Sequence, residues 1–152
     1  YKDLVLRIRK MFPDSAITTD IMVGFAGETE QEFAASLDFA KEIGFAKAHI
    51  FAYSRRKGTV AYNLPNQITK TEKAERSKKM ISATISTEKE FLVALIGSQQ
   101  EVLFETYEDG FVEGYTKNYS RVRVKSPLSY TGEILKVKVS SVENDSCIGE
   151  FI

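Results

Sequence analysis

A glycine turn that directly follows a short apolar run is the first feature that could support ligand chemistry. Residues 20–29 read DIMVGFAGET, and Ile21 to Val23 have the apolar character of a buried strand. Ligands of parallel α/β sheets collect at the carboxyl ends of the strands, where such turns lie. Gly24 and Phe25 are therefore candidate ligand contacts, although a strand-to-helix turn also needs small residues for steric reasons alone.

A second strand is predicted from Lys47 to Tyr53, with His49, Phe51 and Tyr53 on one face because side chains alternate along a strand. This face could line a pocket at the same sheet edge. His49 could equally be a packed core histidine, and as the only histidine it has no partner for a metal site or a nucleophile triad. We therefore predict neither a catalytic residue nor a metal ligand in this chain.

The loop after that strand reads SRRKGT over residues 54–59 and is strongly basic. Arg55 and Arg56 each offer a planar fork of donors that matches a phosphate or a carboxylate. We expect these two residues to contact an RNA backbone or a substrate carboxylate. The alternative is a solvated loop.

Residues 114–123 read GYTKNYSRVR and interleave aromatic rings with basic side chains. Looped or single-stranded RNA is commonly held by rings that stack on bases and by cations that meet phosphates. The alternative is a β-hairpin whose tyrosines pack inward. The RNA-binding residues predicted here are Lys117, Asn118, Tyr119, Arg121 and Arg123.

The elements that must position these residues follow from periodicity. Apolar side chains at helical spacing predict a helix before Pro13, and a strand follows over residues 17–25. Capping-box pairs, Thr29 with Glu32 and Thr69 with Glu72, predict two more helices, the first ending at Gly44 and the second fraying over residues 84–87. Ala74, Ile81 and Ile85 are expected on one face of the second. Helices alternating with strands indicate a parallel sheet.

From about residue 90 the apolar period changes from helical to two. Val122 and Val124 alternate with basic residues, and Asp109-Gly110 is a hairpin turn sequence. We count about five short strands, which a small closed or partly closed β-barrel accommodates most economically because closure removes exposed edges. The predicted fold class is thus α/β plus all-β, with domains over residues 1–87 and 88–152.

Composition places the chain among ordinary globular proteins. Its 152 residues are 43% hydrophobic and 28% charged, and the formal net charge is zero. The charges are unevenly spread, since residues 54–79 hold eight lysines and arginines against two glutamates. Such basic blocks are candidates for phosphate contact or simply solvated faces. No membrane-spanning run is present and Cys147 is the only cysteine, so we expect a cytoplasmic protein without an intrachain disulfide.

The glycine turn and the basic loop together resemble a family signature. In radical S-adenosylmethionine methylthiotransferases the corresponding stretches read close to GFPGET and YSRRPGT, and here Ala26 and Lys57 replace the prolines. The resemblance implies that residues 1–87 are the carboxyl-terminal part of a radical S-adenosylmethionine (β/α) barrel. It also implies that the cofactor S-adenosylmethionine contacts Gly24, Phe25, Phe51 and Tyr53.

Residues 88–152 are similar to the TRAM domain, a small OB-like β-barrel that follows the radical barrel in these enzymes and binds RNA. The phrase GYTKNY resembles the form found in the members that methylthiolate carbon 2 of threonylcarbamoyladenosine beside the tRNA anticodon. This resemblance implies that the partner of Arg55, Arg56 and the barrel residues is a tRNA anticodon stem-loop.

The family's 4Fe-4S clusters require several closely spaced cysteines, which a lone Cys147 cannot supply. We therefore expect a carboxyl-terminal fragment whose amino-terminal domains lie elsewhere in the same polypeptide, and which alone binds no cofactor and is inactive. Two alternatives stay open. The chain could be a standalone RNA-binding adaptor, or the enzyme could act on isopentenyladenosine tRNA or on a ribosomal protein.

Overall fold

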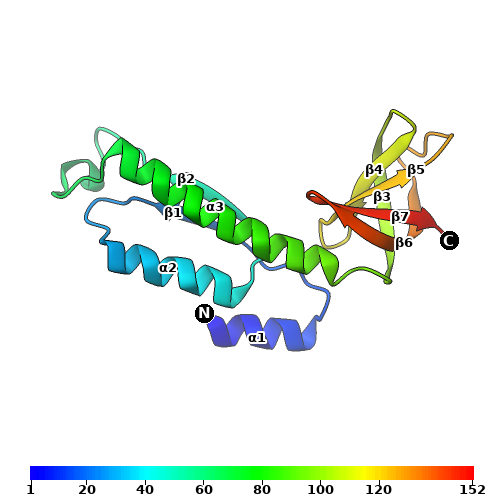
Figure 1. The fold of residues 1–152 in the computed structure, drawn as a ribbon, viewed down its shortest axis with the longest axis horizontal. Coiled ribbons are helices and arrows are strands. Elements are labelled where there is room, and N and C mark those ends of the chain that lie inside the picture. Colours follow the sequence, from blue (N-terminus) through cyan, green and yellow to red (C-terminus); the bar gives the residue numbers. More distant parts are fainter. The chain divides into compact units, whose positions relative to one another are not determined.

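The computed structural model describes residues 1–152 and divides into two compact units. One unit contains residues 17–87 together with Lys2. The other contains residues 88–152 together with Tyr1 and residues 3–16. Figure 1 labels the helices and strands of both units, and each unit is described below by itself. None of the helices combines the length and the apolar character that crossing a membrane requires.

The α/β unit is built on two parallel strands, β1 (Thr18–Val23) and β2 (Lys47–Ala52). Their register pairs Asp20 with His49 and Met22 with Phe51. The connection between them is α2 (Glu30–Ile43), so the predicted strand, helix, strand order is confirmed. Only these two strands form the sheet, and each therefore has a single neighbour.

Both ends of α2 form as the sequence predicts. The Thr29 hydroxyl accepts a hydrogen bond from the Glu32 backbone N–H at 3.2 Å, and the Glu32 carboxylate accepts one from the Thr29 N–H at 2.8 Å. This reciprocal pair satisfies two donors that the first turn of a helix leaves free. Gly44 ends the helix with φ of 64°, a left-handed conformation that glycine adopts without a steric cost.

A short 3-10 turn, η1 (Val60–Asn63), interrupts the loop that leads to α3 (Lys70–Val93). The predicted fraying of α3 over residues 84–87 is wrong, because the helix is continuous. The Thr84 hydroxyl donates to the Met80 carbonyl at 3.0 Å, and the Thr87 hydroxyl donates to the Phe45 carbonyl at 2.9 Å. Hydroxyls that could have competed with the helix backbone thus bond to a carbonyl of α3 itself or to the carbonyl of Phe45, which follows the Gly44 cap of α2.

The buried face of α3 also differs from the predicted one. Met80 is fully buried, whereas Ile81 and Ile85 are exposed and Ala74 lies with them outside the core. The α3 side chains that are buried in this unit are Arg76, Met80, Thr84 and Thr87. Three of these four are polar, so hydrophobicity alone did not identify the packing face.

The second unit is a closed five-stranded barrel, which confirms the number of strands predicted for this region. Its strands are β3 (Gln99–Glu108), β4 (Phe111–Thr116), β5 (Arg121–Lys125), β6 (Ile134–Glu143) and β7 (Ser146–Phe151). They are hydrogen-bonded in the order β3-β4-β5-β7-β6, and β6 returns to β3. The β5–β7 pair is parallel and the others are antiparallel. Greek-key barrels of this kind include the OB fold.

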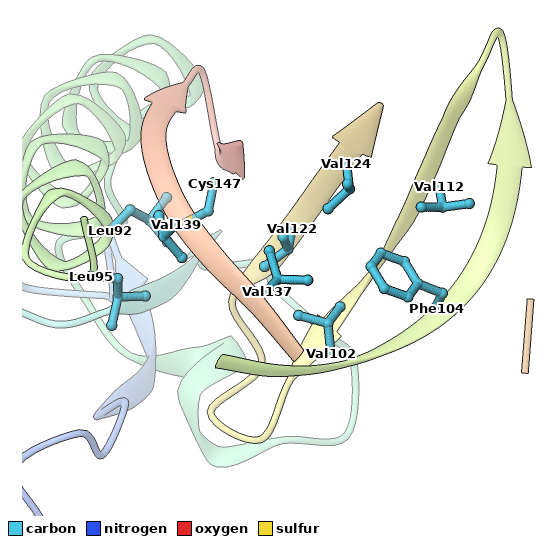
Figure 2. Close-up of a cluster of buried hydrophobic side chains, with 10 residues drawn as sticks. All are labelled: Leu92, Leu95, Val102, Phe104, Val112, Val122, Val124, Val137, Val139 and Cys147. Carbon is cyan, nitrogen blue, oxygen red and sulfur yellow. The ribbon is translucent and has the colours of Figure 1, made fainter. Parts of the chain in front are cut away.

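Aliphatic side chains fill the barrel (Figure 2). Phe104 is completely buried at its centre, and its ring packs edge to face on Phe151 with centroids 5.6 Å apart. Gly114 lies on the inner side of β4, where a Cβ would stand 2.0 Å from the Leu103 carbonyl oxygen, so no larger residue fits. The remaining core residues are Leu92, Leu95, Val102, Val112, Val122, Val124, Val137, Val139 and Cys147.

The predicted hairpin turn at Asp109-Gly110 is confirmed. It joins β3 to β4 with φ of 51° at Asp109 and 76° at Gly110. Positive φ at both central residues is the geometry that matches the twist of a two-residue hairpin. The first helix, α1 (Lys2–Met11), ends before Pro13 as predicted and belongs to the same unit, where the Asn118 amide donates to the Asp14 carbonyl at 3.0 Å.

Candidate functional site

The turn after β1 is closed by its own acidic residue. Gly24 has φ of 70°, and its backbone N–H donates to the Glu28 carboxylate at 2.7 Å. A Cβ at Gly24 would lie 2.2 Å from Cγ of Lys73, so both the conformation and the space require glycine. The backbone N–H of Gly24, one of the candidate ligand contacts, therefore already has a partner within the turn.

Arg76 of α3 holds this turn. Its guanidinium donates to the Glu28 carboxylate and to the Glu30 carboxylate, both at 2.6 Å, and to the Glu28 carbonyl at 2.9 Å. The residue is only 4% exposed. Burial works to lower the pKa of Arg76, but its hydrogen bonds to Glu30 and Glu28 outweigh burial and raise the pKa. Arg76 therefore stays charged and ties the turn to α3.

Sequence reasoning missed Arg76. It stands 48 residues after Glu28, inside a helix with many lysines, and no motif distinguishes it. The available signal was indirect, since a largely buried carboxylate such as that of Glu28, whose side chain is 14% exposed, needs a cation or a hydrogen-bond donor.

The other predicted cofactor residues point in different directions. The Phe25 and Tyr53 rings pack edge to face with centroids 4.9 Å apart, and the buried Tyr53 carbonyl accepts from the Lys73 ammonium at 3.0 Å. The Tyr53 hydroxyl is buried without a hydrogen-bond partner. Phe51, by contrast, is 53% exposed beside Met22, which is 55% exposed. Of this set, Phe51 offers an accessible aromatic face.

The exposed face of the two-stranded sheet also carries the single histidine. Asp20 and His49 are register partners there, two residues before Met22 and Phe51 and on the same face, and both are exposed. Within these 152 residues the histidine is therefore not packed in a core. Apolar Met22 and Phe51 provide a surface on which an adenine ring could pack, so this face fits part of S-adenosylmethionine.

An iron-sulfur cluster does not fit the residues of this chain. Cys147 lies in the barrel core, and burial raises the pKa of its thiol to about 11. A cluster ligand must be a thiolate, and several are needed at fixed spacing. Nowhere in the chain do three histidine, cysteine or acidic side chains gather closely enough to hold a metal ion.

The basic loop after β2 distinguishes its two arginines. The Arg55 Nε–H donates to the Tyr62 carbonyl at 2.7 Å, and the guanidinium lies 4.2 Å from the centre of the Tyr62 ring. Arg56 contributes its carbonyl to the turn, where it accepts from the Thr59 hydroxyl at 2.8 Å, and its side chain is exposed. Arg55 is thus held in place, while Arg56 extends into solvent.

The outer face of β4 and β5 collects charged side chains. Glu113 is the register partner of Arg123, and its carboxylate accepts from Arg123 Nε at 2.6 Å and from Arg121 Nε at 3.1 Å. Burial works to raise the pKa of Glu113, but its bonds to Arg121 and Arg123 outweigh burial and lower the pKa. Lys125 continues the basic row on β5 and is exposed.

The loop between these strands presents Tyr119 outward. Tyr119 is 85% exposed with φ of 61°, so the alternative in which this ring packs inside the barrel is wrong. Asn118 shapes the loop instead, since its carbonyl oxygen accepts from the Ser120 hydroxyl at 2.9 Å while its amide holds the Asp14 carbonyl. Lys117 pairs with the Glu101 carboxylate and lowers the pKa of that group by hydrogen bonding, yet remains largely exposed.

Comparison with known proteins gives relatives along the whole chain, although no family model matches it. The threonylcarbamoyladenosine tRNA methylthiotransferase MtaB of Bacillus subtilis is 33% identical over all of this chain and 35% of its own length. The tRNA-2-methylthio-N(6)-dimethylallyladenosine synthase of Caldicellulosiruptor saccharolyticus is 34% identical over all of the chain and 33% of its length.

A third relative has a different named substrate. The ribosomal protein uS12 methylthiotransferase RimO of Geobacter sulfurreducens is 30% identical over 99% of this chain and 36% of its own length. The chain therefore spans about a third of the length of the curated relatives it matches.

Proposed function

Because this chain belongs to the radical S-adenosylmethionine methylthiotransferase family, we propose that it is part of an enzyme that methylthiolates carbon 2 of threonylcarbamoyladenosine next to the tRNA anticodon. Identity does not choose among the relatives' substrates, since the three values are 33%, 34% and 30%. The GYTKNY phrase and the paired Arg55 and Arg56 support the threonylcarbamoyladenosine assignment. We also place the enzyme in the cytoplasm, the compartment that an unpaired cysteine favours.

In this proposal the α/β unit is part of the radical S-adenosylmethionine barrel. The exposed face of its two strands would meet the cofactor, with Phe51 and Met22 as the apolar contact. The bound cofactor supplies the methyl group and the radical, while the 4Fe-4S clusters depend on cysteines from outside these 152 residues. Arg76 and Glu28 would keep the neighbouring turn in one conformation.

The five-stranded barrel would bind the tRNA anticodon stem-loop as a TRAM domain. The observation that carries this proposal is Tyr119, an aromatic residue held at positive φ with its ring in solvent, in a stretch of sequence that also holds Lys117, Arg121 and Arg123. A bulky residue in the left-handed region costs about 1 kcal/mol or more, and such strain concentrates at functional positions. An exposed ring beside cations is suited to stacking on an unpaired base.

RNA binding is tested with an anticodon stem-loop and the Tyr119→Ala variant. If the ring stacks on a base, affinity should fall by about 1–3 kcal/mol with little change in the salt dependence. Melting temperature serves as the control, because an exposed side chain should leave stability nearly unchanged. Wild-type affinity in a folded Arg121→Ala, Arg123→Ala double variant would refute the RNA role of the β4–β5 face.

The nucleoside is tested in cells that lack the gene. Mass spectrometry of hydrolysed tRNA should show loss of the 2-methylthio form of threonylcarbamoyladenosine, with isopentenyladenosine derivatives unaffected. Loss of the 2-methylthio isopentenyladenosine form instead would support the activity named for the 34% identical relative. An unmodified ribosomal protein would support the third relative's activity, and no change in any of the three modifications would favour a standalone RNA-binding adaptor.

A further inference from the structure

Two arginines on the β4–β5 face look equivalent in the sequence but differ in their surroundings. Arg121 and Arg123 stand two residues apart on β5 and point outward from the barrel. Their side chains are similarly accessible, 40% for Arg121 and 34% for Arg123. Accessibility therefore does not distinguish Arg121 from Arg123, so any difference between them must come from their hydrogen-bond and ion-pair partners.

Arg121 is enclosed by carboxylates. Its Nε donates to the Glu113 carboxylate at 3.1 Å, and its Nη2 bonds the same carboxylate oxygen. On the other side, Nη1 lies 3.8 Å from the Asp145 carboxylate in the turn between β6 and β7. The hydrogen bonds that Arg121 donates to Glu113 and the charges of Glu113 and Asp145 raise the pKa of Arg121 despite its partial burial. An incoming anion would meet both acids.

Arg123 uses only the inner edge of its guanidinium. Its Nε donates to the other Glu113 oxygen at 2.6 Å, and its central carbon lies 4.8 Å from the centre of the Phe111 ring. No carboxylate pairs with its terminal nitrogens Nη1 and Nη2. The ring and the carboxylate together hold the guanidinium in one orientation with that outer edge unused.

From this asymmetry, and resting on the proposed RNA-binding function, we propose that Arg123 is the residue of this face that binds an RNA phosphate, while Glu113 and Arg121 are positioning residues. Two N–H groups on one edge of a guanidinium match two oxygens of a phosphodiester. Phe111 supports Arg123 from the side, which reduces the rotamer freedom lost on binding. Arg121 balances the Glu113 charge, so that this carboxylate orients Arg123 without strongly repelling the phosphate.

The test compares two single variants by the salt dependence of anticodon stem-loop binding. Arg123→Ala should lower the slope of log affinity against log salt by about 0.7, the value for one phosphate contact on a single strand. Arg121→Ala should lower that slope by less than half as much. An equal or larger loss of slope in Arg121→Ala would overturn the assignment.

Two further variants separate positioning from simple folding. Arg123→Lys keeps the charge but not the fork, so it should retain the slope and lose several-fold in affinity. Glu113→Gln keeps an acceptor for the arginines and removes the carboxylate, so it should steepen the salt dependence because both arginines then face the phosphates. A Glu113→Gln slope equal to or shallower than wild type would contradict the positioning role.

Inorganic phosphate gives an arm that does not depend on RNA. NMR of the arginine side-chain N–H groups during a phosphate titration should move the Arg123 signals and leave those of Arg121 in place. If the Arg123 signals move but Arg123→Ala leaves RNA affinity unchanged, Arg123 binds phosphate and the proposed RNA-binding function is contradicted. Movement of the Arg121 signals alone would refute the inference.

Discussion

The two units of this chain differ in whether their strands form a closed sheet. In the barrel every strand has two neighbours, and Phe104 and seven other strand residues of the core are no more than 2% exposed. In the α/β unit β1 and β2 have only each other, and Met22 and Phe51 lie in solvent on one sheet face. Closure thus satisfies both backbone and apolar side chains, whereas an open parallel pair leaves edges and a face uncovered.

The difference shows where each unit obtains its stability. The barrel depends on close packing of aliphatic side chains around Phe104. The α/β unit adds buried polar connections between distant segments, notably Arg76 to Glu28 and the Thr87 hydroxyl to the Phe45 carbonyl. We therefore expect the loss of a buried apolar side chain to destabilise the barrel most, and the loss of a buried polar connection to destabilise the α/β unit.

The largest expected effect is on the barrel core. Phe104→Ala should lower the free energy of unfolding of the barrel by about 3–5 kcal/mol, because it removes a buried ring and leaves a cavity. Phe51→Ala is the matched control on the open sheet and should change stability by less than about 0.5 kcal/mol. Urea unfolding followed by amide hydrogen exchange assigns each loss to a unit. Equal losses in the two variants would contradict the contrast between them.

The next effect is on the polar connection of the α/β unit. Arg76→Met should destabilise residues 17–87 by about 2–4 kcal/mol, since Glu28 loses its buried partner. Lys79→Met, at an exposed position of the same helix, serves as the control and should be close to neutral. Hydrogen exchange should show faster opening around Gly24 in the Arg76 variant only. Faster exchange in the barrel instead would mean that the units are not independent.

The smallest effect concerns acid. Because the pKa of Glu113 is lowered in the folded protein, its contribution to stability is present above the unfolded value and is lost as pH falls through the folded pKa. We expect this part of the acid dependence, about 1 kcal/mol after allowance for partly exposed partners, to disappear in Glu113→Gln. The exposed Glu108 provides the control variant, Glu108→Gln. Urea unfolding between pH 7 and pH 3 measures both, and identical pH profiles for wild type and Glu113→Gln would contradict this role.

Much of the local structure was predictable from short-range signals. The capping boxes at Thr29 and Thr69, the left-handed Gly44 and the Asp109-Gly110 hairpin all formed as expected. Each depends on residues within four positions of one another, so local propensity suffices. The packing face of α3 was mispredicted because its core contacts are partly polar, which an apolar pattern does not reveal.

The sequence indicated which regions are candidate sites, but it did not indicate which individual groups there are free to contact a ligand. Residue types and order single out the turn at Gly24 and the β4–β5 segment, and relatives along the whole chain support the family that these motifs resemble. The sequence did not reveal that the Gly24 N–H donates to Glu28. Nor did it reveal that the Asn118 side chain is bonded within its own loop, where it accepts from the Ser120 hydroxyl. Those hydrogen bonds depend on which groups the folded chain brings within bonding distance.

By itself, the sequence determined the alternation of helices and strands and the five-strand count of the carboxyl-terminal region, because caps, periodicity and turn residues act over a few positions. Its motifs also resemble the family that the relatives show. Only the tertiary structure decided the parallel pairing of β5 with β7, the contact of Arg76 with Glu28 and the contact of Arg121 with Asp145 that Arg123 lacks. These join residues about 20 to 50 positions apart. Their partners are chosen by chain topology and burial, which no local pattern encodes.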